Sequence, residues 1–161
     1  MAKKIERKYL AHYIDAGFGT EVNYIRLGAD LEEYGEELNP DVEIAKNILG
    51  EQNVRHNGYE VQSEVEPFYA YTGDPLFEQL AMIANERKTG DDCKTTKIDV
   101  LLDEAGTVVW AYREDCYVVP NSVGGDTSGV QVPFEIRFAG NRTEGDFDLG
   151  TKKFTEKGKA L

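Results

Sequence analysis

The feature that most constrains the fold is a strict alternation of apolar and polar positions between residues 130 and 138. Its apolar members are all β-branched or aromatic: Val130, Val132, Phe134, Ile136 and Phe138. Successive side chains of a β-strand point to opposite faces of a sheet, so this alternation predicts a strand with one buried face. Similar patterns at residues 24–31 and 59–66 predict two more half-buried strands.

The second half of the chain carries further strand signals. The predicted strands there are residues 97–103, 107–119, 142–149 and 153–155. Turns are expected at Ala105-Gly106, which makes the first two a β-hairpin, and at Gly140-Asn141, which reverses the chain after residue 138.

One helix is expected in the middle of the chain. Asp74 is a capping residue, Pro75 suits the first helical position, and Gly90 lies beyond the end of an apolar stripe. A single helix among many strands predicts a mainly β fold: an antiparallel sandwich or barrel with one flanking α-helix. We expect one domain over residues 1–161.

Residues 35–57 show weak periodicity around Asn39-Pro40 and are predicted to be a long loop. Loops of about twenty residues in compact domains are usually functional or disordered. Residues 1–8 and 156–161 are predicted to be polar, flexible tails.

The net charge of −12 is concentrated in the first half of the chain. Between Asp30 and Glu66 there are eleven acidic residues, opposed only by Lys46 and Arg55, whereas both ends are rich in lysine. Such a chain repels nucleic acid. The acidic middle is either a solvated face or, with the basic ends, a means of head-to-tail self-association.

The sequence indicates assembly inside a cell without insertion into a membrane. No apolar run approaches the roughly 20 residues that span a bilayer, and no hydrophobic signal region follows the N-terminal lysines. Cys93 and Cys116 lack metal-ligand spacing, so two reduced structural cysteines are favoured over a disulfide.

A search for catalytic or ligand-binding motifs finds little. His12 and His56 have no nucleophile in a recognisable pattern, and Asp91-Asp92 supply too few ligands for a cation. The glycine-rich residues 124–129 lack the lysine of a phosphate-binding loop. We therefore expect no enzymatic activity, no cofactor and no bound metal.

Several segments, in order, resemble the major tail proteins (tail-tube proteins) of tailed bacteriophages and of prophages in Gram-positive bacteria. They are residues 38–43, 46–51, 59–62, 65–70, 74–77, 89–92, 111–115, 124–127, 133–134 and 140–142. The match runs from about residue 24 to 155. It implies a small β-sandwich with a flanking helix, hexameric rings that stack into a hollow tube, and passage of DNA through that tube.

The resemblance also implies partners and a location. Copies of the chain, the tape-measure protein, the tail terminator and the distal tail protein are expected partners, within a virion tail that assembles in the bacterial cytoplasm. We expect the long loop to contact neighbouring subunits or rings through Glu36, Glu37, Asn39, Pro40, Asp41, Glu43 and Lys46. The acidic face of residues 59–66 is expected to line the tube through Glu60, Gln62, Glu64 and Glu66.

Three alternatives stay open at this point. The chain could serve a contractile or type VI-like machine as its tube subunit, or it could be an acidic module that binds one basic protein. A carboxylate hydrolase is the third, and it requires Glu64 and Glu66 to point into one pocket.

Overall fold

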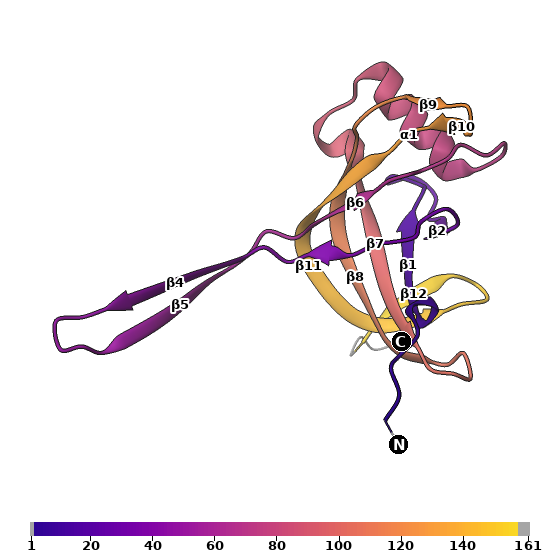
Figure 1. Ribbon diagram of the computed structural model, residues 1–161. Helices are drawn as coiled ribbons and strands as arrows, with labels where there is room; N and C mark the ends of the chain where they lie inside the picture. Colours follow the sequence, from indigo (N-terminus) through magenta and orange to yellow (C-terminus); the bar gives the residue numbers. More distant parts are fainter. Residues whose placement is uncertain (1, 158–161) are drawn as a thin grey trace.

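The chain folds into a curled antiparallel sheet, with a helix at one end and a long two-stranded arm projecting from its side (Figure 1). A computed structural model describes residues 2–157. The main sheet has eight strands in the order β2-β1-β7-β8-β11-β6-β3, with β12 paired to β11. Their bounds are β1 Leu10–Asp15, β2 Tyr24–Leu27, β3 Glu36–Glu37, β6 Gln62–Val65, β7 Lys94–Leu102, β8 Val108–Pro120, β11 Phe134–Asp148 and β12 Lys153–Glu156. The predicted mainly β class is confirmed, as a half-barrel.

Smaller elements complete the structure. They are the helix α1 Pro75–Glu86, the hairpin of β4 Pro40–Lys46 and β5 Gln52–Tyr59, the pair of β9 Gly124–Asp126 and β10 Gly129–Gln131, and the 3₁₀ turns η1 Arg7–Tyr9 and η2 Gly90–Cys93. Within the described residues 2–157, no helix has the length and apolar character needed to cross a bilayer.

The buried face predicted for residues 130–138 is confirmed from Val132 onward, but the single strand is divided into β10 and β11. Val132, Phe134 and Ile136 are fully buried, beneath α1 and between β8 and β6. Val130 departs from the pattern because it lies in β10 and is exposed. Pro133 separates the two strands, since a proline has no N–H group with which to continue a ladder.

The predicted helix forms as its capping signals indicate. The Leu76 backbone N–H donates to Asp74 Oδ1 at 3.0 Å, and Pro75 occupies the first helical position. The helix ends at Arg87, which adopts a left-handed conformation (φ 54°) shortly before Gly90. Its buried side chains are Leu76, Leu80 and Ile83, which close one end of the half-barrel.

The predicted hairpin of β7 and β8 is also confirmed, with Leu102 opposite Val108. A second core lies on the other face of this hairpin, because β11 curls around and brings Phe147 onto it. The residues of this core are Ala11, Tyr13, Tyr24, Ile98, Val100, Ala111 and Phe147. β7 is therefore buried on both faces.

The predicted turn at Gly140-Asn141 is wrong, because β11 continues without reversal to Asp148. The pairing with β8 shifts register twice between Phe138 and Thr143. Gly140 (φ 93°) and Asn141 (φ 57°) are both left-handed there. Extra residues in one strand make β-bulges that bend it, so this dipeptide curves β11 around the half-barrel.

The long loop predicted at residues 35–57 is wrong as secondary structure. After the two-residue strand β3, the chain forms β4, turns at residues 47–51 and returns as β5. Weak alternation concealed these strands, because a projecting hairpin has no body beneath it to bury one face.

The single strand predicted at residues 59–66 is likewise divided. Tyr59 ends β5, and β6 begins only at Gln62, so the pattern crosses from the arm to the main sheet. The C-terminal tail prediction is wrong at its start, since Glu156 lies in β12 and the Lys157 N–H donates to Glu144 O at 2.9 Å. Residues 158–161 lie outside the described residues, as does Met1. The N-terminal tail predicted at residues 1–8 is wrong at its end: residues 2–6 are exposed and adopt no regular structure, but Arg7 and Lys8 lie in η1.

Candidate functional site

The arm, which comprises β4 and β5 (residues 40–59), projects away from the half-barrel (Figure 1). The strand register places Ile44 opposite Val54, and Glu43 opposite Arg55. Val42, Ile44 and Val54 therefore share one face, here called the apolar face, with Lys46, Gln52 and His56 at its margins. The other face carries Glu43, Ala45, Asn53 and Arg55. Ile44 is 64% exposed and Val54 59% exposed. The arm is thus an amphipathic hairpin whose apolar face is uncovered.

The tip of the arm is ordered by a side chain. Asn47 Oδ1 accepts hydrogen bonds from the backbone N–H groups of Leu49 (2.9 Å) and Glu51 (3.0 Å). This arrangement turns Ile48 and Leu49 outward, and Leu49 is 75% exposed. Exposed apolar side chains on an ordered turn are typical of a contact surface.

A charged cluster lies inside the half-barrel near the base of the arm. Its members are His12, Glu36, Lys97, Asp99, Glu114 and Arg142. The Lys97 side chain is 0% exposed, and its ammonium contacts the carboxylates of Glu36 and Asp99. Arg142 pairs with Glu114 Oε1 at 3.0 Å and approaches Asp99 Oδ2 at 3.6 Å. Within residues 2–157, no buried side-chain nitrogen or oxygen lacks a hydrogen-bond partner.

His12 links this cluster to the N-terminal segment. Its Nδ1 lies 2.6 Å from Asp99 Oδ1, and its Nε2 lies 2.9 Å from the Arg7 guanidinium. Arginine only donates, so Nε2 accepts and the proton sits on Nδ1, which donates to Asp99. Burial lowers the pKa of His12, which agrees with this neutral ring.

Burial and neighbouring charges move the carboxyl groups in opposite directions. Burial raises the pKa of Glu36 to about 7, although Lys97 opposes that effect. Burial also acts to raise the pKa of Asp99, but Lys97 and the hydrogen bond from His12 outweigh it and hold the pKa below its usual range. Asp99 is therefore the permanent anion of the cluster, and Glu36 is the carboxyl group that titrates near neutral pH.

His12, Glu36 and Asp99 have the ligand types and the proximity of a metal site. The Lys97 ammonium, however, contacts both carboxylates and lies 3.3 Å from His12 Nδ1. A divalent ion would have to displace this buried cation, which the Tyr34 ring also contacts at 5.1 Å. Lys97 thus supplies the positive charge that a metal would bring.

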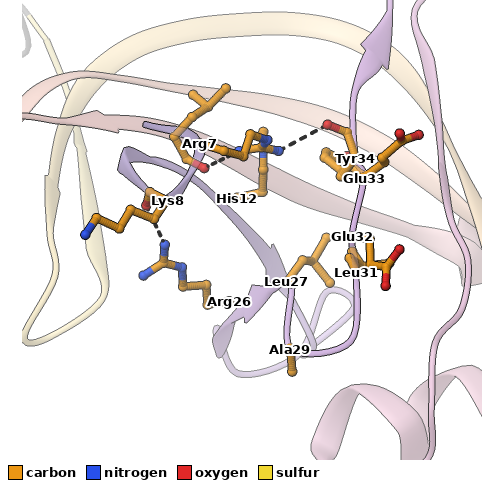
Figure 2. A pocket seen from close by; sticks show the side chains of 12 residues that line it. Arg7, Lys8, His12, Arg26, Leu27, Ala29, Leu31, Glu32, Glu33 and Tyr34 are labelled. Carbon is orange, nitrogen blue, oxygen red and sulfur yellow. Dashed lines mark hydrogen bonds between the residues drawn. The ribbon is translucent and has the colours of Figure 1, made fainter. Parts of the chain in front are cut away.

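A pocket of about 570 Å³ lies between the N-terminal segment and the connection from β2 to β3 (Figure 2). Arg7 donates to Leu10 O at 2.7 Å and to Tyr34 O at 3.1 Å, while Arg26 donates to Lys8 O at 3.0 Å. Because these guanidinium groups bind backbone carbonyl groups, they hold the walls of the pocket together. They are not an open anion site.

The predicted lumen residues lie on the outer face of the main sheet and its junction with the arm. Glu60, Glu64 and Glu66 are exposed and Gln62 is half-buried. Glu64 lies opposite Glu135 of β11, and Gln62 lies opposite Arg137. The face is thus acidic with one interspersed cation. Glu64 and Glu66 are both on the open surface, unlike a pair of hydrolase carboxylates in a pocket.

The residues of segment 35–57 that were predicted to contact neighbouring subunits fall into two groups. Asn39, Pro40, Asp41, Glu43 and Lys46 are exposed on the arm or at its base, as is Glu37. Glu36 instead turns inward and joins the charged cluster, with a side chain 14% exposed. Through Glu36, the segment that leads into the arm is therefore connected to the buried ammonium of Lys97.

Sequence reasoning missed the charged cluster. Lys97 and Asp99 alternate with Ile98 and Val100, which predicts a solvent-facing polar side, yet β7 is buried on both faces. One available signal was Leu101, an apolar residue at the next position of the same face. Cys93 and Cys116 are both buried free thiols, and burial raises the pKa of each.

No family model matches the sequence, and a search of curated proteins gives no match. Solved structures that are similar in fold include the following two. One is the sheath/tube terminator of an extracellular contractile injection system (PVC) in its extended state, with a TM-score of 0.54 and 11% identity over 91% of this chain and 99% of that chain. The other is the tube-terminating cap of the anti-feeding prophage, with a TM-score of 0.53 and 13% identity over 89% of this chain and 92% of that chain.

These likenesses define the class of fold. The chain has the fold of a component of phage-tail-like particles, which agrees with the tail-like fold that the sequence resemblance implied. At identities of 11% and 13%, the likeness extends to the fold alone.

Proposed function

We propose that this chain is a structural subunit of a phage-tail-like tube, assembling with further copies into hexameric rings that stack around a channel for DNA. The observation that carries the proposal is the arm, whose uncovered apolar face and tip need a partner to exclude water. Each large apolar side chain that leaves water contributes roughly 1.5–3 kcal/mol, so repeated arm contacts are strong enough to support assembly.

The edges of the half-barrel support the same proposal. The main sheet ends at β2 on one side and at the two-residue strand β3 on the other, so backbone groups at these edges are open to pairing. Edge pairing between copies related by rotation would close a ring and remove the open edges. In that ring, Glu60, Gln62, Glu64 and Glu66 would face the channel and repel DNA phosphates.

A tube terminator is the second candidate, favoured by the two structures of similar fold. A terminator joins copies laterally into one ring, whereas a tube subunit also stacks rings on both faces. A tube subunit of a contractile or type VI-like machine would stack rings in the same way as any tube subunit. We expect the partners to be other tail proteins: the tape-measure protein, the distal tail protein and, for a tube subunit, the terminator. No enzymatic step and no cofactor are part of the proposal.

Negative-stain electron microscopy of concentrated protein tests this function. Stacked hollow tubes support the tube subunit, and single rings that do not stack support the terminator. The matched control replaces residues 41–58 by a short glycine-serine turn, and it should remain monomeric while folding normally. A wild-type protein that stays monomeric both alone and with tail-tip initiator proteins would overturn the proposal.

A further inference from the structure

The arm joins the half-barrel through a narrow root, residues 36–39 and 59–62. Among the described residues, β4 and β5 pair only with each other. At the root, β3 pairs with β6, Asn39 Nδ2 donates to Glu60 O at 3.0 Å, and the Phe138 N–H donates to Val61 O at 3.1 Å. The Glu60 N–H also donates to Asn39 O at 3.4 Å, so a two-stranded ladder runs from β3 and β6 into the arm. Two-stranded ribbons twist strongly, so this ladder does not by itself set one direction for the arm.

Glu36 is the one side chain of the two-residue strand β3 that points into the body. Glu37 points outward and is exposed, in keeping with the alternation of a strand. Glu36 instead contacts the ammonium of Lys97, in β7, which lies in the interior of the main sheet between β1 and β8. The root of the arm is thereby tied to the middle of the sheet as well as to its edge.

Lys97 is itself held in place from several sides. Asp99 contacts the ammonium from the same face of β7, and the rings of Tyr34 and Phe138 lie 5.1 Å and 5.6 Å from it. Glu36 therefore meets a cation that Asp99 and Phe138, on strands outside the arm, also hold. A pair of oppositely charged groups with one good geometry restricts the root more than an apolar contact, which tolerates sliding.

We infer that Glu36 and Lys97 are positioning residues that fix the direction in which the arm leaves the half-barrel. This inference rests on the proposed function, in which the direction of the arm decides whether copies meet in the geometry of a ring. A buried ion pair is often replaceable by apolar residues without loss of stability, so its presence at the root fits a role in orientation better than one in stability.

The double variant Glu36→Leu/Lys97→Met leaves the net charge unchanged and separates a role in orienting the arm from a role in stability. It removes one anion and one cation, and Asp99 keeps His12 and Arg142 as partners. Glu37→Leu is the matched control, since it alters the outward-facing neighbour on the same strand. Glu36→Gln is the second variant, because it preserves shape while removing the charge, and it keeps the test decisive if the double variant does not fold.

The readout is amide hydrogen exchange at the root, measured on soluble protein, together with ring or tube formation by electron microscopy. We expect native-like unfolding in urea, exchange at residues 37–39 and 59–62 faster by about tenfold or more, and loss of regular assemblies in the double variant. If the amide hydrogens of the root exchange in the double variant at the wild-type rate, the inference is overturned. Failure of the wild-type protein to assemble would instead count against the proposed function, and the exchange result would still decide the role of the pair.

Discussion

Replacing Lys97 by methionine is expected to destabilise the fold by about 3 kcal/mol at pH 8, because it leaves a buried carboxylate without its cation. Removing one partner of a buried ion pair typically costs about 3–5 kcal/mol. The lower end applies here: Asp99 also loses Lys97 but keeps the hydrogen bond from His12 at 2.6 Å and Arg142 at 3.6 Å, whereas Glu36 loses the cation that it contacts. At pH 5 the cost should be smaller, because a protonated Glu36 needs no counter-ion.

Urea unfolding followed by the fluorescence of Trp110, the only tryptophan, measures this effect. The double variant Glu36→Leu/Lys97→Met should recover most of the lost stability, so the two single changes should be strongly non-additive. A Lys97→Met variant within about 0.5 kcal/mol of wild type, or a double variant as unstable as the sum of the singles, would refute the description of the cluster.

Three further predictions concern Glu36 in the charged cluster, the cap of α1 and the packing of β12. Because burial raises the pKa of Glu36 from 4.5 to about 7, the native state binds its proton more tightly, and wild-type stability falls as pH rises through that window. The stability of Glu36→Gln relative to wild type should therefore increase from pH 4.5 to 7 in urea titrations, and a constant difference would contradict this. Asp74→Ala removes the cap of α1 and should cost about 1 kcal/mol by thermal or urea unfolding, with no change in the denaturant slope. Gly145→Ala should destabilise by about 1–3 kcal/mol, since its Cβ would lie 2.2 Å from Thr155 O and displace β12. Gly35→Ala meets nothing within 4 Å and is the control, and an equal loss in both variants would show that crowding at β12 is not the cause.

Much of the fold could be predicted because local signals and tertiary packing agree there. Val132, Phe134 and Ile136 alternate in the sequence and are buried together, and Asp74-Pro75 begins the helix as its chemistry indicates. The dipeptide Gly140-Asn141 could not be interpreted locally. Left-handed residues serve equally in a turn and in a bulge, and pairing with the distant strand β8 decides between them.

The site was predicted only in part, and for a related reason. The segment that holds Asn39, Asp41 and Glu43 was expected to be a loop that contacts neighbouring subunits; it is a projecting hairpin instead (Figure 1), and the contact itself stays a prediction. His12 and Lys97 are 85 positions apart, and no local spacing shows that a curled sheet brings them to 3.3 Å. Burial of both faces of β7 depends on β11 curling over it, and a pattern within one strand does not contain that information.

In the proposed function, the apolar face of the arm joins copies of this chain. Its two faces can be altered separately, because Val42, Ile44 and Val54 lie on one and Glu43, Asn53 and Arg55 on the other. Changing either set of three residues to serine should leave the unfolding midpoint of the body unaltered, since both sets are exposed.

Sedimentation velocity over a range of protein concentrations is the most direct measurement. We expect the variant with three serines on the apolar face to sediment as a monomer, whereas wild type and the variant of the polar face form large particles at the same concentrations. Assembly of the apolar-face variant to the same extent as wild type would contradict this expectation.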